Sequence, residues 1–121
     1  MDQSLFFIGA VSAFIAVTAG GARAHWLDKR LPAERLPMLE VGMRYQRGHA
    51  IGILFCSLAA YVFDSYLPLV AGWVFVAGTL LFSGAMYGFA LSGRKPLLRA
   101  APAGGVLFMA GWVCLAVSAL I

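Results

Sequence analysis

Three long segments without a charged side chain constrain what this sequence can fold into. They run from Ser4 to Ala22, from Leu67 to Leu91 and from Ala101 to Ile121, and each is rich in aliphatic and aromatic residues. The hydrocarbon core of a bilayer is about 30 Å thick, and a helix needs about 20 mainly apolar residues to cross it. The three segments therefore predict membrane-spanning helices at 4–22, 67–91 and 101–121.

The composition of the 121 residues excludes the main soluble classes of protein. Hydrophobic residues make up 62% and charged residues 12% of the chain, whereas soluble domains carry roughly 25% charged residues. A small soluble domain has too much surface to be covered by so few polar groups, and a disordered chain needs low hydrophobicity and high charge. The formal net charge is +4. Because the basic residues lie between apolar segments, we expect anionic lipid headgroups as partners and no nucleic acid.

A fourth segment is a weaker candidate for a membrane-spanning helix. Only the fourteen residues from Ala50 to Phe63 are uninterrupted by charge, which is short for a span. The segment becomes long enough if the helix begins near Arg44, with Arg44 and Arg47 extending toward the headgroups. We therefore expect a full span over 44–63. The alternative is a short re-entrant hairpin, which would place Asp64 at membrane depth with no evident partner.

The basic residues are segregated into two of the three connections. All nine lie within 23–47 or 92–100, and the connection at 64–68 has none. With four spans, the first and third connections share one side of the membrane. Cytoplasmic loops carry the excess of lysine and arginine, so we expect both termini on the non-cytoplasmic side. A bacterial inner (plasma) membrane is the expected location.

The first segment resembles a signal peptide in its apolar core and in the Ala22-Arg23-Ala24 sequence. A signal peptide, however, begins with positive charge, and the region before this segment contains Asp2 and no lysine or arginine. We therefore expect this segment to be retained as a helix.

The stretch from His25 to Val41 is comparatively polar. Pro32 and Pro37 exclude one unbroken helix through it, because proline removes a backbone donor and clashes with the preceding turn. Pro32 is expected to open a short helix that Pro37 breaks or bends. The mixture of apolar and basic side chains suits a segment that lies in the membrane interface; a solvated loop is the alternative.

Small residues spaced four apart occur in each predicted span. Gly48 and Gly52 form one Gly-x-x-x-Gly pair, and Gly84 and Gly88 form another. Helices in lipid associate through close contact at small residues and through interhelical hydrogen bonds. The sequence thus predicts a single all-α domain, a compact bundle of four transmembrane helices, or the same contacts used in a homo-oligomer. The residues expected to pack the helices are Gly48, Gly52, Ser83, Gly84, Tyr87, Gly88, Gly104, Gly105 and Gly111.

Polar residues near the ends of the first two spans form a candidate pocket. His25 closes the first span, Tyr45 and His49 share one face of the second, and Gln46 and Arg23 lie at a similar level. Ionisable groups near a bilayer are functional candidates, so the pocket is interpreted as a site for a headgroup, a quinone or a proton-active ligand. The alternative is a hydrogen-bonded cluster that joins the two helices. We favour the structural alternative. Ser83 and Tyr87 are expected to bond Gln46 or a backbone carbonyl.

No arrangement of residues indicates catalysis. The spans contain no carboxylate to orient a histidine, no nucleophile motif and no phosphate-binding loop. Two histidines without a carboxylate or paired cysteines are a poor metal site. Cys56 and Cys114 lie in apolar stretches and are expected to behave as small hydrophobic residues. We therefore expect a protein that is not an enzyme and that has neither a metal nor a cofactor.

Motifs in all four spans resemble those of the domain of unknown function 423 family. That family shows Gly-Ala-x-Gly-Ala-His, Tyr-Gln-x-x-His-Ala, Phe-Ser-Gly-x-x-Tyr, Pro-x-Gly-Gly and Gly-Trp. The Tyr-Gln-x-x-His-Ala element is the most specific, and Arg23 replaces a small residue of the first motif. In chain order, the matching positions are 20–25; Tyr45, Gln46, His49 and Ala50; Phe82, Ser83, Gly84 and Tyr87; Pro102, Gly104 and Gly105; and Gly111 and Trp112.

The resemblance implies a small four-span membrane protein and no defined activity. Our leading hypothesis is a non-enzymatic accessory protein that binds lipids, other membrane proteins or a second copy of itself. Two alternatives use a cluster of His25 and His49. One is a small oligomeric transporter or channel, and the other is a module that binds a quinone or a lipid.

Overall fold

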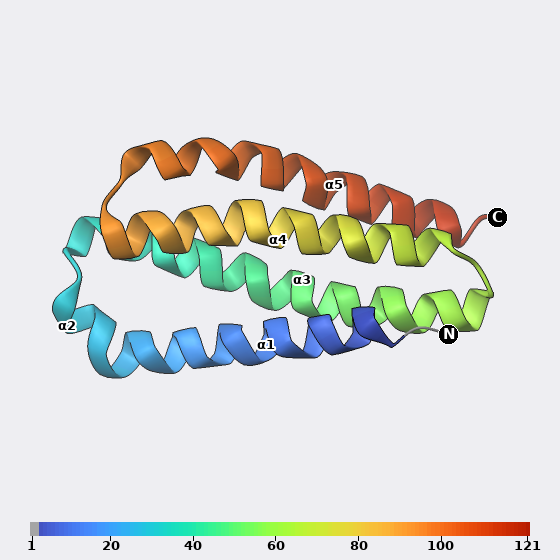
Figure 1. Cartoon of the computed structure of the whole chain (residues 1–121), viewed down its shortest axis with the longest axis horizontal. Helices are drawn as coiled ribbons and strands as arrows, with labels where there is room; N and C mark the ends of the chain where they lie inside the picture. The colour runs from blue at the N-terminus through green and yellow to red at the C-terminus, as the bar shows by residue number, and fades with distance from the viewer. Residues whose placement is uncertain (1–2) are drawn as a thin grey trace.

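A computed structural model describes residues 3–121, and Asp2, which bears on the expectation of a retained first helix, lies outside this range. The described chain is helical and has no strand. Its long helices are α1 (Ser4–Ala22), α3 (Leu36–Phe63), α4 (Leu67–Ser92) and α5 (Ala101–Ser118) (Figure 1). The connections contain a π-helix η1 (Arg23–Leu27), α2 (Asp28–Arg30) and the 3₁₀ helices η2 (Ala33–Arg35) and η3 (Lys95–Ala100).

Within this range, three helical stretches are long and apolar enough to cross a membrane. They are Ser4–Arg30, Leu67–Ser92 and Lys95–Ser118. α3 is not among them, although its 28 residues extend for about 42 Å at 1.5 Å per residue. The N-terminal half of α3 carries Glu40, Arg44 and Arg47, and these charges lower its hydropathy.

α3 begins at Leu36 rather than near Arg44, so the predicted start of this helix and the predicted break at Pro37 are both wrong. Pro37 lies in the first turn of α3, where the backbone N–H has no partner within the helix and proline removes nothing. The expected helix after Pro32 is present only as the single turn η2. The polar connection is therefore shorter than predicted, and its last residues belong to α3.

α3 continues to Phe63, and no turn interrupts it between Arg44 and Phe63. It ends at Asp64, whose φ of 50° and ψ of 53° place it in the left-handed region. This turn lies at the same end of the molecule as the start of α1 and the end of α5, and the two basic connections lie at the opposite end (Figure 1). There Gly93 (φ 76°) is so close to Arg35 that an added Cβ would lie 2.8 Å from the guanidinium Nη1. The basic connections thus meet, as their charge pattern suggested.

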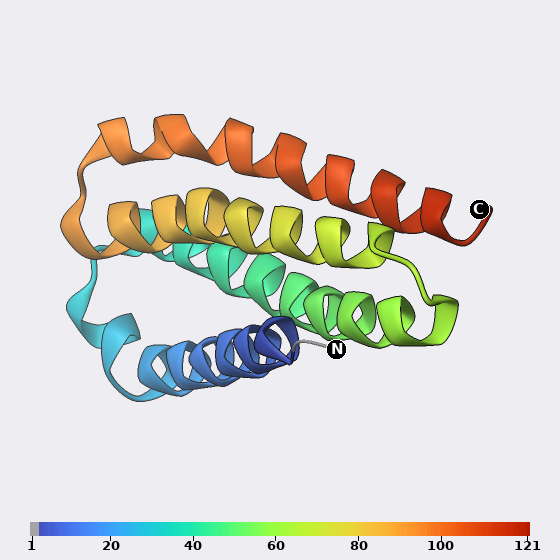
Figure 2. The ribbon, with the colours of Figure 1, turned by 45° about the vertical axis from the view of Figure 1, so that its right-hand side comes forward.

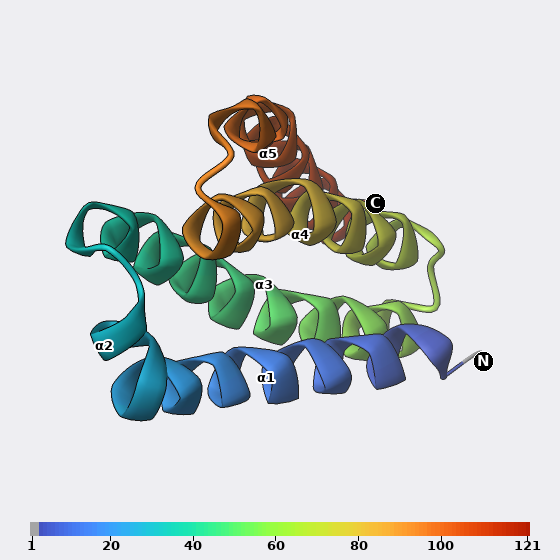
Figure 3. The same cartoon turned by 60° about the vertical axis from the view of Figure 1, so that its left-hand side comes forward.

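The long helices pack in series rather than as a closed bundle. Extensive backbone proximity joins α1 to α3, α3 to α4, and α4 to α5. α1 meets α4 at fewer points, mainly where Leu5 packs on Gly72, and α3 meets α5 through side chains such as His49, Phe108 and Trp112. Figure 2 shows this succession, and Figure 3 shows α1 and α5 at opposite edges with α3 and α4 between them. The expectation of four long helices is met. α5 packs on α4 and on side chains of α3, and it does not cover α1.

Glycines allow the central helices to approach closely. A Cβ at Gly104 would lie 2.5 Å from the backbone nitrogen of Phe82 and 2.8 Å from the carbonyl oxygen of Gly78. α4 and α5 therefore touch backbone to backbone at this point. Gly111 and Gly52 lie against opposite parts of the Phe75 ring, so one aromatic side chain fills the space between α3, α4 and α5.

Some predicted packing residues make no contact within the chain. Added Cβ atoms at Gly48, Gly84 and Gly105 would meet nothing within 4 Å, so neither Gly-x-x-x-Gly sequence works as a pair of contacts here. Gly88 does pack, but against Leu97 of η3. Contacts that the spacing did not indicate occur at single glycines, among them Gly9, Gly42, Gly72 and Gly78.

Neighbouring glycines in α5 provide a direct test of this packing. Gly104→Ala should lower the free energy of unfolding by about 1–3 kcal/mol, because the new methyl group meets backbone atoms that a rotamer change cannot move. Gly105→Ala, the matched control, should be neutral or stabilising by up to about 1 kcal/mol, because its methyl group enters open space and alanine favours helix. Unfolding in mixed detergent micelles, followed by circular dichroism, measures both. Equal effects of the two substitutions would contradict the close contact.

Candidate functional site

Gln46 joins three helices through its side-chain amide. Its Nε2 donates to Ser12 Oγ of α1 at 3.2 Å, and its Oε1 accepts from the Tyr87 hydroxyl of α4 at 2.5 Å. One turn earlier, Ser83 Oγ donates to the carbonyl oxygen of Gly42 at 2.8 Å. The expected bonds of Ser83 and Tyr87 to a backbone carbonyl and to Gln46 are therefore confirmed. Away from water such bonds satisfy polar groups that otherwise lack partners.

His49 lies near the middle of α3 and is 7% exposed. Its Nε2 accepts a hydrogen bond from Trp112 Nε1 of α5 at 3.0 Å, so Nε2 carries no proton. Its Nδ1 lies 2.8 Å from the carbonyl oxygen of Tyr45. Nδ1 must then carry the proton and donate it, because a carbonyl oxygen only accepts. Both ring nitrogens are satisfied in the uncharged form of the imidazole.

Aromatic rings enclose the imidazole of His49. The Phe108 ring stacks on it with centroids 3.6 Å apart and an interplanar angle of 11°. Phe75 approaches edge-on at 5.2 Å. Tyr45, one turn before His49, lies nearly parallel at 6.1 Å, as their shared helix face predicted. A shallow hollow of about 380 Å³ opens beside these rings, between α3 and α5, and Trp112 forms part of its wall.

The predicted pocket residues divide into separate groups. Tyr45 and His49 face α5, and Gln46 faces α1 and α4. Arg23 instead forms ion pairs with Asp28 at 3.0 Å and with Glu40 at 2.5 Å.

His25 is exposed on η1, and within the described chain no hydrogen bond or ring contact joins it to the other predicted residues. The prediction of one shared pocket is therefore wrong. Its cause is the early start of α3, which places His49 about 20 Å from the N-terminal end of that helix.

The chemistry of these groups is hydrogen bonding and ring packing. Among residues 3–121, no group of three or more histidine, cysteine or acidic side chains could hold a metal ion. The partners of His49 were not found from the sequence, because Phe75, Phe108 and Trp112 are distant from it in the chain and no local spacing connects them. Trp112 appeared only as part of the Gly-Trp motif. No pattern in the sequence indicated that Ser12 would bond Gln46 or that Glu40 would pair with Arg23.

Comparison with known sequences shows the family to which the chain belongs. A family model described as "Protein of unknown function (DUF423)" matches residues 19–105, which include Gln46, His49 and Tyr87. The chain belongs to the DUF423 family. This membership agrees with the resemblance seen in the motifs. The matched region extends from the end of α1 into α5.

Curated relatives of this DUF423 protein cover nearly all of its length. The UPF0382 inner membrane protein YgdD of Escherichia coli strain K12 is 35% identical and covers 98% of this chain and 91% of the relative. A UPF0382 membrane protein of Haemophilus influenzae is also 35% identical, covering 96% and 93%. YwdK, a UPF0382 membrane protein of Bacillus subtilis, is 32% identical and covers 93% of each. No solved structure matches the chain.

Two tryptophans of this DUF423 protein with the same exposure test the His49 contact. Trp112 is 45% exposed and bonds His49, whereas Trp73 is 46% exposed and makes no side-chain hydrogen bond in the described chain. Trp112→Phe should lower the free energy of unfolding by about 1–3 kcal/mol, because it leaves Nε2 of His49 without a donor. Trp73→Phe should cost clearly less. Unfolding in mixed micelles measures both; similar losses would contradict a structural role for the bond.

Proposed function

We propose that this protein is a four-span, non-enzymatic membrane protein of the bacterial inner membrane that associates with lipids, other membrane proteins or a second copy of itself. The observation that carries the proposal is the open succession of helices, which leaves glycines and large apolar side chains exposed on faces that no other part of the described chain covers.

Four spans are favoured by the position of α3 between its neighbours. α3 packs along α1 and α4, both of which are long and apolar enough to cross a membrane. A helix held between two spanning helices crosses with them, and its polar residues Gln46 and His49 are paired inside the protein. The basic connections lie at one end of the molecule (Figure 1), so the positive-inside rule places that end in the cytoplasm and both termini on the other side.

The outer face of α3 is the part of the surface best suited to a partner helix. It consists of Arg44, Gly48, Ile51, Phe55 and Leu58, all exposed and spaced three or four residues apart. Glycine weakens an isolated helix by roughly 1 kcal/mol relative to alanine, and no neighbour of Gly48 in the described part of the chain uses its small size. A second helix that packs on this face would make use of it, because close approach is what small residues provide in lipid.

A transporter, or a quinone- or lipid-binding module, built on His25 and His49 together receives less support. The two histidines lie on different elements, and both nitrogens of His49 are engaged within the protein. The hollow beside Tyr45 and Trp112 is lined mainly by rings, which suits packing against lipid.

Labelling of single cysteines tests the four spans. In a background without Cys56 and Cys114, Ser65→Cys should react with a membrane-impermeant maleimide in intact cells. Arg30→Cys and Arg94→Cys should react only after the membrane is opened, because both belong to the basic end. If α3 did not cross, Ser65→Cys and Arg30→Cys would be labelled from the same side. Labelling of Arg30→Cys and Arg94→Cys from opposite sides would also contradict the topology.

Native mass spectrometry after mild extraction tests the association. The wild-type protein should retain bound lipid, a second copy or another membrane protein. Gly48→Leu should reduce the retained protein partner severalfold, because leucine blocks close approach on the α3 outer face. Gly21→Leu is the matched control, since Gly21 is also exposed with nothing within 4 Å but lies on α1. A lipid-free wild-type monomer without partners would argue against the proposal.

A further inference from the structure

A cleft between α1 and α4 contains polar groups deep inside an apolar surface. Its volume is about 200 Å³, and Gln46 and Ile53 of α3 also line it. The walls are mainly aliphatic and aromatic, with Phe7 and Val11 on α1 and Val76 and Leu80 on α4. Phe7 is 67% exposed and Leu80 is 70% exposed, so the cleft opens outward. Its two helices pack closely only near Leu5 and Gly72.

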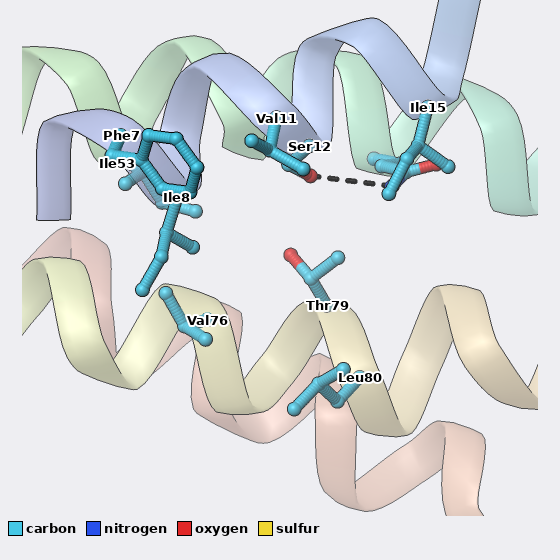
Figure 4. A pocket seen from close by; sticks show the side chains of 10 residues that line it. Phe7, Ile8, Val11, Ser12, Ile15, Ile53, Val76, Thr79 and Leu80 are labelled. Atoms are coloured by element: carbon cyan, nitrogen blue, oxygen red, sulfur yellow. Dashed lines mark hydrogen bonds between the residues drawn. The ribbon is translucent and has the colours of Figure 1, made fainter. Parts of the chain in front are cut away.

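Thr79 places in this cleft a hydroxyl group that has no hydrogen-bond partner among residues 3–121. The residue is 9% exposed, lies near the middle of α4, and its Oγ1 is buried and unpaired. In many helices a threonine hydroxyl bonds the carbonyl four residues earlier, but here it points across the cleft toward α1 (Figure 4). A buried hydroxyl without a partner is unfavourable, so this group indicates a ligand.

Ser12 faces Thr79 from the opposite wall (Figure 4). Its oxygen accepts the hydrogen bond from Gln46 Nε2, and its own proton has no acceptor in the described chain. Two hydroxyl groups that can donate therefore face the same space. The complementary group is an oxygen with two lone pairs, and a carbonyl oxygen is such an acceptor.

Size and polarity together select the occupant. A cavity of about 150 Å³ lined by apolar side chains can bind benzene, so this cleft has room for a compact ring compound. A lipid acyl chain would contact the apolar side chains of the cleft but would leave both hydroxyl groups without an acceptor. A water molecule would bond the hydroxyl groups but would leave most of the apolar walls without contact.

We propose that the α1–α4 cleft binds a flat, apolar ring compound that bears a carbonyl oxygen, the chemistry of a membrane quinone head. The carbonyl oxygen lies between the hydroxyl groups of Thr79 and Ser12, and the ring lies against Val11, Val76 and Leu80. The ligand enters from the bilayer through the open side of the cleft. This site is separate from the α3 outer face and from the hollow beside His49, so it does not depend on the proposed association.

Binding of 2,3-dimethyl-1,4-naphthoquinone to the protein in nanodiscs tests the site, with empty nanodiscs as background. Both open positions of its quinone ring carry methyl groups, so thiols such as that of Cys56 do not react with the ring by addition. Thr79→Val should weaken this binding about fivefold, the loss expected for one hydrogen bond. Binding of 2,3-dimethylnaphthalene, which has the same shape and no carbonyl, should not change with Thr79→Val. Val76→Phe, which fills the cleft, should abolish binding of both compounds.

Matched controls separate the hydroxyl effect from a general one. Thr18→Val makes the same substitution on the exposed face of α1 and should leave both affinities unchanged. Thr79→Val should melt at the same or a higher temperature than the wild type, since it removes an unpaired hydroxyl. The proposal is overturned if the quinone binds no better than to empty nanodiscs, or if Thr79→Val and Thr18→Val behave alike. It is equally overturned if methyl octanoate, a flexible ester, competes as well as the quinone.

Discussion

The pairing of polar side chains on α3 is the constraint on which the rest of the structure depends. α3 is the least apolar of the long helices and carries Gln46 and His49 near its middle. Without water, each of these side chains needs partners from the protein. Gln46 takes them from α1 and α4, and His49 takes one from α5. These bonds fix which faces of α3 point inward and therefore how its neighbours are placed.

Close backbone contact at glycines is the second interaction that holds the helices together. Gly78 and Gly104 bring α4 and α5 together closely enough for Phe75 to pack between Gly52 and Gly111. The same ring touches the imidazole of His49. Packing and hydrogen bonding therefore meet at one place, and the aromatic residues around His49 are as much part of the helix packing as of a polar cluster.

Much of the fold followed from short-range patterns. The uncharged segments gave α1, α4 and α5 nearly to the residue, and the charge pattern placed both basic connections at one end. The hydrogen bonds of Ser83 and Tyr87 could also be anticipated, because a polar side chain in an apolar helix needs a partner. The start of α3 was missed because the sequence alone does not distinguish a proline in the first turn of a helix, such as Pro37, from a proline that breaks one. The partners of His49 and the unpaired Thr79 depend on contacts between distant residues, which no local spacing encodes.

The serial order of the helices also determines how α1 is held against the remainder of the molecule. α1 is connected to the remainder mainly through α3, by the packing of Gly9 against Ile53 and Leu54, by the Ser12–Gln46 bond and by the Arg23–Glu40 ion pair. α1 also reaches α4 directly at Leu5, which is buried against Gly72. The width of the α1–α4 cleft is therefore set by how α1 is seated on α3, together with the one close contact that α1 makes with α4, Leu5 on Gly72.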